Sequence, residues 1–256
     1  MEKINNSQTD RFLKLSKGYT NTYERNRRIK DWDSKEEVAK KILEDFKKRV
    51  GDPKGKRLLD VGFGNGAFSV EFARAGAEVS GIEVNPILLN IAKENRDKSG
   101  VKVDFQIYDG NSFPLEDESF DYIYSTNVAE HTNSVGLFLR EINRVLKPGG
   151  LVYLSFPNRF APKETHSGLW FISYFPRGVS EWYVKHIRGR NIISELNLHF
   201  LSYFTLLRNL KKTQLSVRFE VDSPNLVKRV FKKFLALFNI HHSILLRTIM
   251  VILEKK

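Results

Sequence analysis

The chain has 256 residues, a length that suits one large α/β domain with an insertion. Hydrophobic residues make up 41% and charged residues 28%, which is a globular rather than a disordered composition. No apolar run reaches the roughly 18–20 residues that span a bilayer, and the absence of cysteine excludes disulfides, thiolate metal sites and a cysteine nucleophile. The start lacks the apolar stretch of a secretory signal, so we expect a cytoplasmic, enzyme-sized domain.

Short apolar strands alternate with helical patterns along the first part of the chain, after a polar helical stretch over 24–50. The predicted elements are strands over 57–61, 78–82, 101–107, 120–125 and 151–156, and helices over 67–75, 86–97 and 135–146. Strands that alternate with helices pair in parallel, so we predict a sheet with helices on both faces. Ligands bind at the carboxyl ends of the strands in such sheets.

The pattern changes after residue 156. Residues 157–197 are irregular and rich in aromatic side chains, which is typical of a lid or substrate wall. A helix over 201–212, a strand over 214–221, an amphipathic helix over 225–238 and a strand over 244–253 follow. We find no internal repeat.

The positive charge of the chain is concentrated in this last part. Of the formal net charge of +12, residues 157–256 carry 17 Lys and Arg against 6 Asp and Glu. Such asymmetry favours an anionic partner: nucleic acid, a phospholipid surface or a phosphorylated substrate. The helix over 225–238 separates four basic residues from an apolar face, so it either packs on the sheet or contacts an anionic membrane, at the inner membrane face.

A glycine-rich turn joins the first predicted strand to the next helix. It carries Gly62, Gly64 and Gly66, and Asp60 lies at the end of the strand. Glycine lets backbone amides approach a ligand closely. The turn also fits a dinucleotide fingerprint that ends at Ala67, so the glycines alone leave the ligand open.

Three acidic residues narrow the choice of ligand. Asp60 would repel a pyrophosphate and instead suits a cationic amino group. Glu83 ends the second strand, about twenty residues on, where a carboxylate can accept both ribose hydroxyls. Asp109 follows the third strand and can accept a hydrogen bond from an adenine amine, with Phe113 against the ring. An amino acid, a ribose and an adenine together describe S-adenosylmethionine.

The span from about Lys56 to Phe156 resembles the class I S-adenosylmethionine-dependent methyltransferases, in the type 11 group of small-molecule methylases. The glycine turn, the acid that closes strand two and the Asp109-Gly110 step carry this resemblance, together with the patterns over 120–125 and 141–150. It implies a Rossmann-like, seven-stranded, mostly parallel sheet with an antiparallel last strand and helices on both faces. Strands six and seven would come from 214–221 and 244–253.

The resemblance also implies how the chain is divided and which residues hold the cofactor. The expected parts are an N-terminal helical segment that covers the cofactor site (1–55), an S-adenosylmethionine-binding core (56–156), a lid insertion (157–199) and the C-terminal part of the same sheet (200–256). Carried over by position, the contacts are Asp60, Gly62, Gly64 and Gly66 at the methionine moiety, Glu83 at the ribose, Asp109 and Gly110 at the adenine, and Asn127 near the sulfonium.

Methyl transfer to a hydroxyl benefits from a general base, and the residues after strand four are the natural place for one. Glu130-His131 resembles the Glu-His pair of quinone-type O-methyltransferases. In some of those an acid three residues before the Glu completes a metal site; here that residue is Asn127, so no metal is predicted. His166, in the aromatic insertion, is the competing base. Either histidine could instead have a purely structural place.

The insertion from 156 to 176 resembles that of methyltransferases associated with surface polysaccharides and lipid-linked glycans. Aromatic rings stack on sugars and arginines bind phosphate or carboxylate groups. We therefore expect O-methylation of a sugar or lipid-linked glycan intermediate, with a quinone-like or other small hydroxylated molecule second. An RNA methyltransferase, an NAD-dependent oxidoreductase or epimerase, and an inactive partner subunit are the remaining alternatives. No nucleic-acid-binding module is evident, and the sequence leaves the oligomeric state open.

Overall fold

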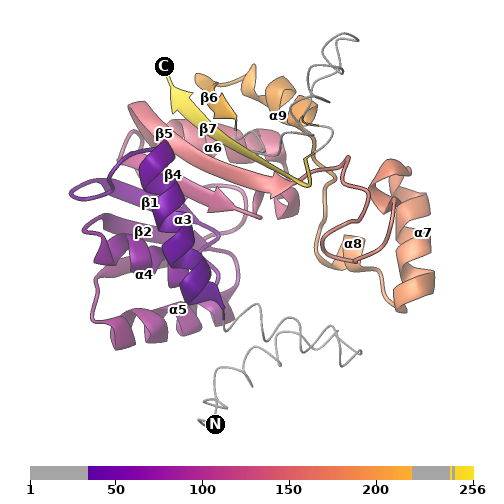
Figure 1. The fold of residues 1–256 in the computed structure, drawn as a ribbon, viewed down its shortest axis with the longest axis horizontal. Helices are drawn as coiled ribbons and strands as arrows, with labels where there is room; N and C mark the ends of the chain where they lie inside the picture. Colours follow the sequence, from indigo (N-terminus) through magenta and orange to yellow (C-terminus); the bar gives the residue numbers. More distant parts are fainter. Residues whose placement is uncertain (1–33, 221–242, 244–245) are drawn as a thin grey trace. The chain divides into compact units, whose positions relative to one another are not determined.

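The structure, a computed structural model, describes residues 34–220, 243 and 246–256. Its seven strands form one sheet in the order β3-β2-β1-β4-β5-β7-β6 (Figure 1). The pairs β1–β2, β2–β3 and β4–β5 are parallel, whereas β7 is antiparallel to both β5 and β6. The predicted Rossmann-like sheet with an antiparallel last strand is confirmed. The chain divides into two compact units, residues 1–109 and 110–256.

The N-terminal unit alternates strands and helices as predicted. Its elements are α3 (Lys35–Arg49), β1 (Arg57–Val61), α4 (Ala67–Arg74), β2 (Glu78–Glu83), α5 (Pro86–Ser99) and β3 (Val103–Ile107). Leu58, Leu59 and Ile82 on the strands are fully buried. Helix α3 packs on α4, where the rings of Phe46 and Phe72 meet edge to face with centroids 4.9 Å apart.

The C-terminal unit holds the rest of the sheet and the insertion. Its elements are β4 (Phe120–Thr126), η1 (Ala129–His131), α6 (Val135–Val145), β5 (Leu146–Pro157), η2 (Ile172–Tyr174), α7 (Arg177–Arg188), α8 (Ile192–Glu195), α9 (Tyr203–Leu210), β6 (Leu215–Glu220) and β7 (Thr248–Lys255). Residues 151–156 of β5 are all buried, because β4 and β7 pair with its two edges.

The insertion after β5 is more regular than the sequence predicts. Residues 177–188 form the helix α7, and a small core of its own lies beneath it: Ile172, Val184, Ile192, Ile193 and Leu198. The helical period was hard to recognise because only Ser180 and Val184 of α7 are buried, whereas Trp182 and Ile187 are exposed. Burial of the small core stabilises this segment, which a pattern of aromatic residues alone does not reveal.

Two predicted features lie outside the described residues: the start of the first helix (24–33) and the amphipathic helix over 225–238. Among the residues that are described, no helix is long and apolar enough to cross a membrane.

Candidate active site

The glycine turn between β1 and α4 has the backbone conformation that its glycines predict. Gly62, Gly64 and Gly66 all have positive φ, at 75°, 57° and 79°, a region that side chains with a Cβ rarely adopt. A Cβ on Gly66 would lie 2.9 Å from the Cβ of Ala92, so this glycine is also required for packing. Among the described residues, a Cβ on Gly64 would meet only the Nζ atom of Lys35, at 3.4 Å. The turn therefore leaves backbone open beside Gly64.

Asp60 is a buried carboxylate at the end of β1, as predicted. It is 1% exposed and accepts a 2.5 Å hydrogen bond from the hydroxyl of Ser69 on α4. Burial raises the pKa of Asp60 to about 7, the charge of Glu83 adds to this, and the charge of Lys35 opposes it. A buried carboxylate with this pKa gains strongly from a cationic ligand.

Glu83, at the end of β2, holds the glycine turn from the other side. Its Oε2 accepts a hydrogen bond from the backbone amide of Gly64 at 3.2 Å, and its Oε1 accepts from Val84 (2.9 Å) and Asn85 (3.2 Å). A carboxylate has about four lone-pair sites, and three are used here, so acceptor capacity for about one more hydroxyl remains, on Oε2. Glu83 thus fixes the turn and can also bind a ribose.

Lys35, on α3, is a residue that sequence reasoning missed. Its ammonium lies beside Gly64 and its charge acts on Asp60. Nothing in its local sequence distinguishes it from the other lysines of that polar helix; only the packing of α3 brings it to the turn.

The residues predicted on the adenine side are Asp109, Gly110 and Phe113. Asp109 is exposed after β3, and Gly110 has a positive φ of 83°. Phe113, however, is 3% exposed and packs edge to face on Phe138, with ring centroids 6.2 Å apart. The expectation that Phe113 covers an adenine ring is therefore wrong, because α6 takes up this ring in the core.

A separate cluster of candidate residues follows β4 in the C-terminal unit. Asn127 is exposed with a positive φ of 56°, and its amide donates to the carbonyl of Ser155. Glu130 is buried, with its side chain 2% exposed, and burial raises its pKa to about 7. Neither Glu130 oxygen has a hydrogen-bond partner within the described part of the chain. The Nε2 atoms of His131 and His166 each lie 3.9 Å from the Oε1 atom of Glu130.

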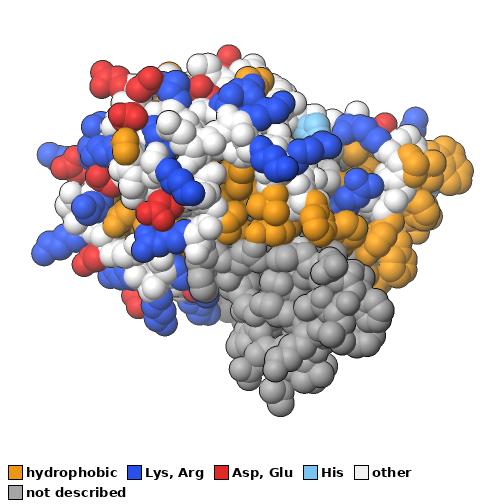
Figure 2. All heavy atoms as spheres, turned by 90° about the horizontal axis from the view of Figure 1, so that it is seen from above, with side chains coloured by type: hydrophobic (Ala, Val, Ile, Leu, Met, Phe, Trp, Pro, Cys, Tyr) orange, Lys and Arg blue, Asp and Glu red, His pale blue; other side chains and the backbone are white. Residues whose placement is uncertain are grey.

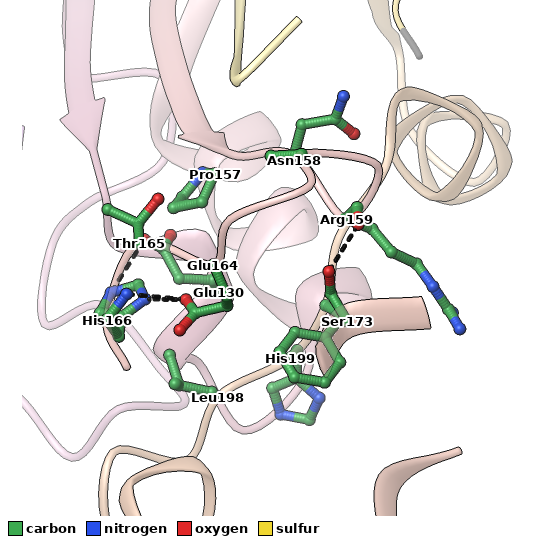
Figure 3. Close-up of a pocket in the computed structure, with 12 residues that line it drawn as sticks. Glu130, Pro157, Asn158, Arg159, Glu164, Thr165, His166, Ser173, Leu198 and His199 are labelled. Atoms are coloured by element: carbon green, nitrogen blue, oxygen red, sulfur yellow. Dashed lines mark hydrogen bonds and ion pairs between the residues drawn. The ribbon is translucent and has the colours of Figure 1, made fainter. Parts of the chain in front are cut away.

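The two histidines have the same internal arrangement. Nδ1 of His131 lies 2.8 Å from the carbonyl oxygen of Leu196. Nδ1 of His166 lies 2.9 Å from Oε1 of Glu164 (Figure 3). Although burial opposes it, the hydrogen bond and charge of His166 lower the pKa of Glu164 to about 2. Because both partners can only accept, the Nδ1 atom of each ring is the donor in these hydrogen bonds.

The loop over 196–199 fixes the backbone that carries Glu130 and His131. The amide of His199 donates to the carbonyl of Glu130 at 2.7 Å, and the side chain of Asn197 donates to the carbonyl of His131 at 3.2 Å. A pocket is lined by Glu130, Glu164, His166 and His199, among others (Figure 3). Its cavity volume of about 20 Å³ holds one water molecule or ion.

Comparison with known proteins finds similar sequences over residues of both units. Residues 59–154 match a family described as "Methyltransferase domain". The ubiquinone biosynthesis O-methyltransferase of Cereibacter sphaeroides (strain ATCC 17029 / ATH 2.4.9) is 31% identical over 152 residues, which cover 57% of this chain and 61% of that protein. Over residues 59–154 the chain is therefore similar to methyltransferases.

The chain is also similar to a further relative and to solved structures of the same fold. An enzyme of the same name from Azorhizobium caulinodans is 34% identical over 134 residues, covering 50% of this chain and 52% of the relative. These matches span between half and about three fifths of the relatives' length. A methyltransferase structure from Aquifex aeolicus superimposes with a TM-score of 0.56 at 21% identity, covering 90% of this chain and 98% of that one.

The matched residues of the methyltransferase domain include the predicted cofactor residues and the Glu130-His131 pair, but not His166. The comparisons do not support the glycan-associated resemblance of the insertion, since the family match ends before it.

Proposed function

We propose that the chain transfers a methyl group from S-adenosylmethionine to a hydroxyl of a small, quinone-like acceptor. The observation that carries this proposal is the buried Glu130 carboxylate with the Nε2 atoms of His131 and His166 facing it. The names of the relatives, ubiquinone biosynthesis O-methyltransferases, favour an oxygen acceptor on a quinone-like molecule. The sugar or lipid-linked glycan that the sequence favours has weaker support.

The cofactor would be held by the N-terminal unit and the residues that follow it. The open backbone of the glycine turn, the buried Asp60 and the acceptor capacity of Glu83 fit its methionine and ribose moieties. We assign the amino group to Asp60, the ribose to Glu83 and the carboxylate to Lys35. Asp109 and Gly110 remain assigned to the adenine, and Asn127 to the methionine end.

S-Adenosylmethionine supplies an electrophilic methyl group when bound. Transfer to a hydroxyl forms a carbon–oxygen bond, breaks the carbon–sulfur bond and requires that the oxygen lose its proton. Groups with lone pairs directed at the hydroxyl promote this loss. We assign that role to the cluster of Glu130, His131 and His166. The two rings are held at Nδ1 by Leu196 and Glu164, and their Nε2 atoms face Glu130.

Methylation of defined acceptors tests the proposed function. The purified full chain is incubated with S-adenosylmethionine and either an alkyl catechol or a methyl glycoside, and mass spectrometry identifies the product. We expect methylation of the catechol oxygen. His131→Ala and His166→Ala should each lower kcat by about 10²–10⁴-fold with unchanged affinity for S-adenosylhomocysteine.

The control variant is His186→Ala, since His186 is exposed on α7 and its Nδ1 lies 3.0 Å from the carbonyl oxygen of Trp182. Its kcat should match the wild type. Methylation of the glycoside alone would restore the glycan assignment, and binding of S-adenosylhomocysteine without methylation of either class would contradict the proposal.

Removal of the Glu83 side chain is expected to weaken cofactor binding. Glu83→Ala leaves the ribose hydroxyls and the amide of Gly64 without their acceptor, at a cost of about 1–3 kcal/mol. Isothermal titration with S-adenosylhomocysteine measures this. Asp104→Ala, which removes an exposed acid of β3, is the control and should leave the affinity unchanged.

We also propose that the insertion contacts an anionic membrane surface. Its large apolar side chains are unusually exposed, between 43% and 61%: Trp170, Phe171, Tyr174, Phe175, Trp182 and Ile187. Figure 2 shows hydrophobic side chains gathered at the right of the molecule, beside Lys and Arg. Exposed Lys163, Arg177 and Lys185 supply positive charge in the same segment. Aromatic and basic side chains together suit the interface of an anionic bilayer.

Co-sedimentation with phosphatidylglycerol vesicles tests the membrane contact. The double variant Trp170→Ala/Trp182→Ala should lower the partition coefficient at least about tenfold, because it removes two large exposed apolar groups. Phe204→Ala on α9, an aromatic residue that is 48% exposed outside the insertion, should behave as the wild type. Equal sedimentation of all three proteins would contradict the assignment to this surface.

A further inference from the structure

We propose that Glu164 is a positioning residue that makes His166 the general base of the methyl transfer. This inference rests on the proposed function, and it assigns the proton of the acceptor hydroxyl to one ring of the cluster. Glu164 and His166 lie in the insertion, between β5 and η2. The residues that match a methyltransferase family end at 154, so both lie outside them.

The Glu164 carboxylate is buried and surrounded by hydrogen-bond donors. Its Oε1 atom accepts from the backbone amide of His166 at 2.8 Å and from Nδ1 of the ring at 2.9 Å. Its Oε2 atom accepts from the amide and the hydroxyl of Ser167, at 2.6 and 2.7 Å. These contacts use the roughly four lone-pair sites of a carboxylate. Burial opposes ionisation, but the hydrogen bonds and the charge of His166 lower the pKa of Glu164 to about 2, so it is an anion at neutral pH.

The two histidines of the cluster differ in the charge of the partner at Nδ1. His131 has the neutral carbonyl of Leu196, whereas His166 has the carboxylate of Glu164. A buried anion stabilises an imidazolium more than a carbonyl does, because opposite charges interact strongly where water is excluded. A carboxylate at Nδ1 also fixes the tautomer in which Nε2 is the acceptor, as in a catalytic triad. His166 is therefore the better proton acceptor of the two rings.

The Nε2 side of the His166 ring can accommodate the oxygen that loses its proton. Nε2 lies 3.9 Å from Oε1 of Glu130, which is too long for a direct hydrogen bond, but one oxygen atom can lie about 2.8 Å from both. The adjoining pocket has a volume of about 20 Å³, enough for one water-sized oxygen (Figure 3). An acceptor hydroxyl there passes its proton to Nε2 as the carbon–oxygen bond forms, and the imidazolium keeps that proton beside Glu164.

The loop that carries Glu164 is also held by contacts that do not involve the carboxylate. The amide of Glu164 donates to the carbonyl of Leu169 at 2.9 Å, and the amide of Gly168 donates to the carbonyl of Glu164 at 3.0 Å. The guanidinium of Arg188 donates to the carbonyl of Ser167 at 3.0 Å. A change of the carboxylate alone is therefore expected to leave the path of the loop in place.

Nitrogen NMR of the histidine rings tests the positioning without reference to activity. The full chain, labelled with nitrogen-15 in histidine and bound to S-adenosylhomocysteine, is titrated between about pH 5 and 9. The signal that is missing in His166→Ala identifies the ring. We expect the neutral ring of the wild type to carry its proton on Nδ1. In Glu164→Gln the proton should move in part to Nε2, because the amide nitrogen of glutamine cannot accept.

The pH dependence of kcat tests the role in methyl transfer. Activity rises with pH as the base loses its proton. Loss of the Glu164 charge destabilises the imidazolium, so Glu164→Gln should move this rise to lower pH by about 1–3 units and lower kcat about 10²–10⁴-fold. KM for the catechol and affinity for S-adenosylhomocysteine should be unchanged. The matched control is Glu195→Gln, which removes an exposed carboxylate of the insertion that pairs with Arg190.

The other titratable groups that face the His166 ring in the described part of the chain are Glu130 and His131. The rings of His131 and His166 meet edge to face with centroids 4.9 Å apart. Both groups are the same in the wild type and in Glu164→Gln, so the difference between the two pH profiles reports the Glu164 charge. Imidazole added to His166→Gly should restore part of kcat, whereas imidazole added to His131→Gly should not.

The outcomes separate this inference from the proposed function. A displaced pH profile in Glu164→Gln, with imidazole rescue confined to His166→Gly, supports it. Methylation of the catechol with a wild-type profile in Glu164→Gln would overturn it and leave the methyl transfer standing. If neither acceptor is methylated, the proposed function fails and the role of His166 as base fails with it. An unchanged ring spectrum in Glu164→Gln would then overturn the positioning as well.

Discussion

Asp60→Asn is expected to abolish the binding of S-adenosylmethionine and, at the same time, to stabilise the ligand-free protein at pH 8. The carboxylate is buried, 1% exposed, and accepts a hydrogen bond from the hydroxyl of Ser69. Asparagine keeps an acceptor for Ser69 but has no charge to pair with an amino group. Moving the pKa of Asp60 from 3.8 to about 7 corresponds to roughly 4 kcal/mol of destabilisation once the group is ionised.

The pH dependence of stability follows from the raised pKa of Asp60. The folded protein binds the proton more tightly than the unfolded chain, so the stabilisation from protonated Asp60 is complete below about pH 4. It decreases as pH rises towards 7 and stays lost above that value. Thermal unfolding of wild type and Asp60→Asn should therefore diverge between pH 4 and 7 and stay apart at pH 8.

Cofactor binding has the opposite pH dependence. Only ionised Asp60 pairs with an ammonium group, so the affinity for S-adenosylhomocysteine should fall as the solution is acidified below pH 7. Glu83 and Lys35 are the charged groups that act on Asp60, and neither reverses this sign. Asp104→Asn, an exposed acid of β3, is the control. Unchanged affinity of Asp60→Asn would remove Asp60 from the cofactor site.

Gly64 and Gly66 lie in the same turn, but we expect Gly64→Arg to affect ligand binding and Gly66→Ala to affect packing. Gly64→Arg should abolish binding of S-adenosylhomocysteine with the fold intact, because only a flexible lysine ammonium lies near its Cβ position. Gly66→Ala should lower the free energy of unfolding by about 2–5 kcal/mol, since its Cβ would lie 2.9 Å from Ala92 and 3.1 Å from Phe105.

Gly55→Ala isolates the backbone strain from this clash. Gly55 also has a positive φ, of 68°, but nothing lies within 4 Å of its Cβ position. It should lose about 1–2 kcal/mol from strain alone. Chemical denaturation measures all three variants. If the free energy of unfolding of Gly66→Ala is as high as that of Gly55→Ala, the contact with Ala92 accommodates the added Cβ without loss of stability.

Elements with a clear local period were predictable to within a few residues. Strand β1 matches the prediction at Arg57–Val61, and α5 begins at the predicted Pro86 after the side chain of Asn85 caps its first turn. Strand β5 begins earlier than predicted, at Leu146, because the segment before Leu151 extends the pairing with β4. The helix α7 was missed because most of its apolar side chains are exposed, so its period does not mark a buried face.

The sequence by itself determined the sheet and the glycine turn, because both depend on local requirements. Alternating strands and helices specify parallel pairing, and a positive φ at Gly62, Gly64 and Gly66 requires glycine at those spacings. The tertiary structure alone decided which distant residues meet. Lys35 reaches the turn only because α3 packs on α4, and His166 faces Glu130 only because the insertion folds on a small core of its own. Burial and long-range packing produce such contacts, and no local pattern encodes them.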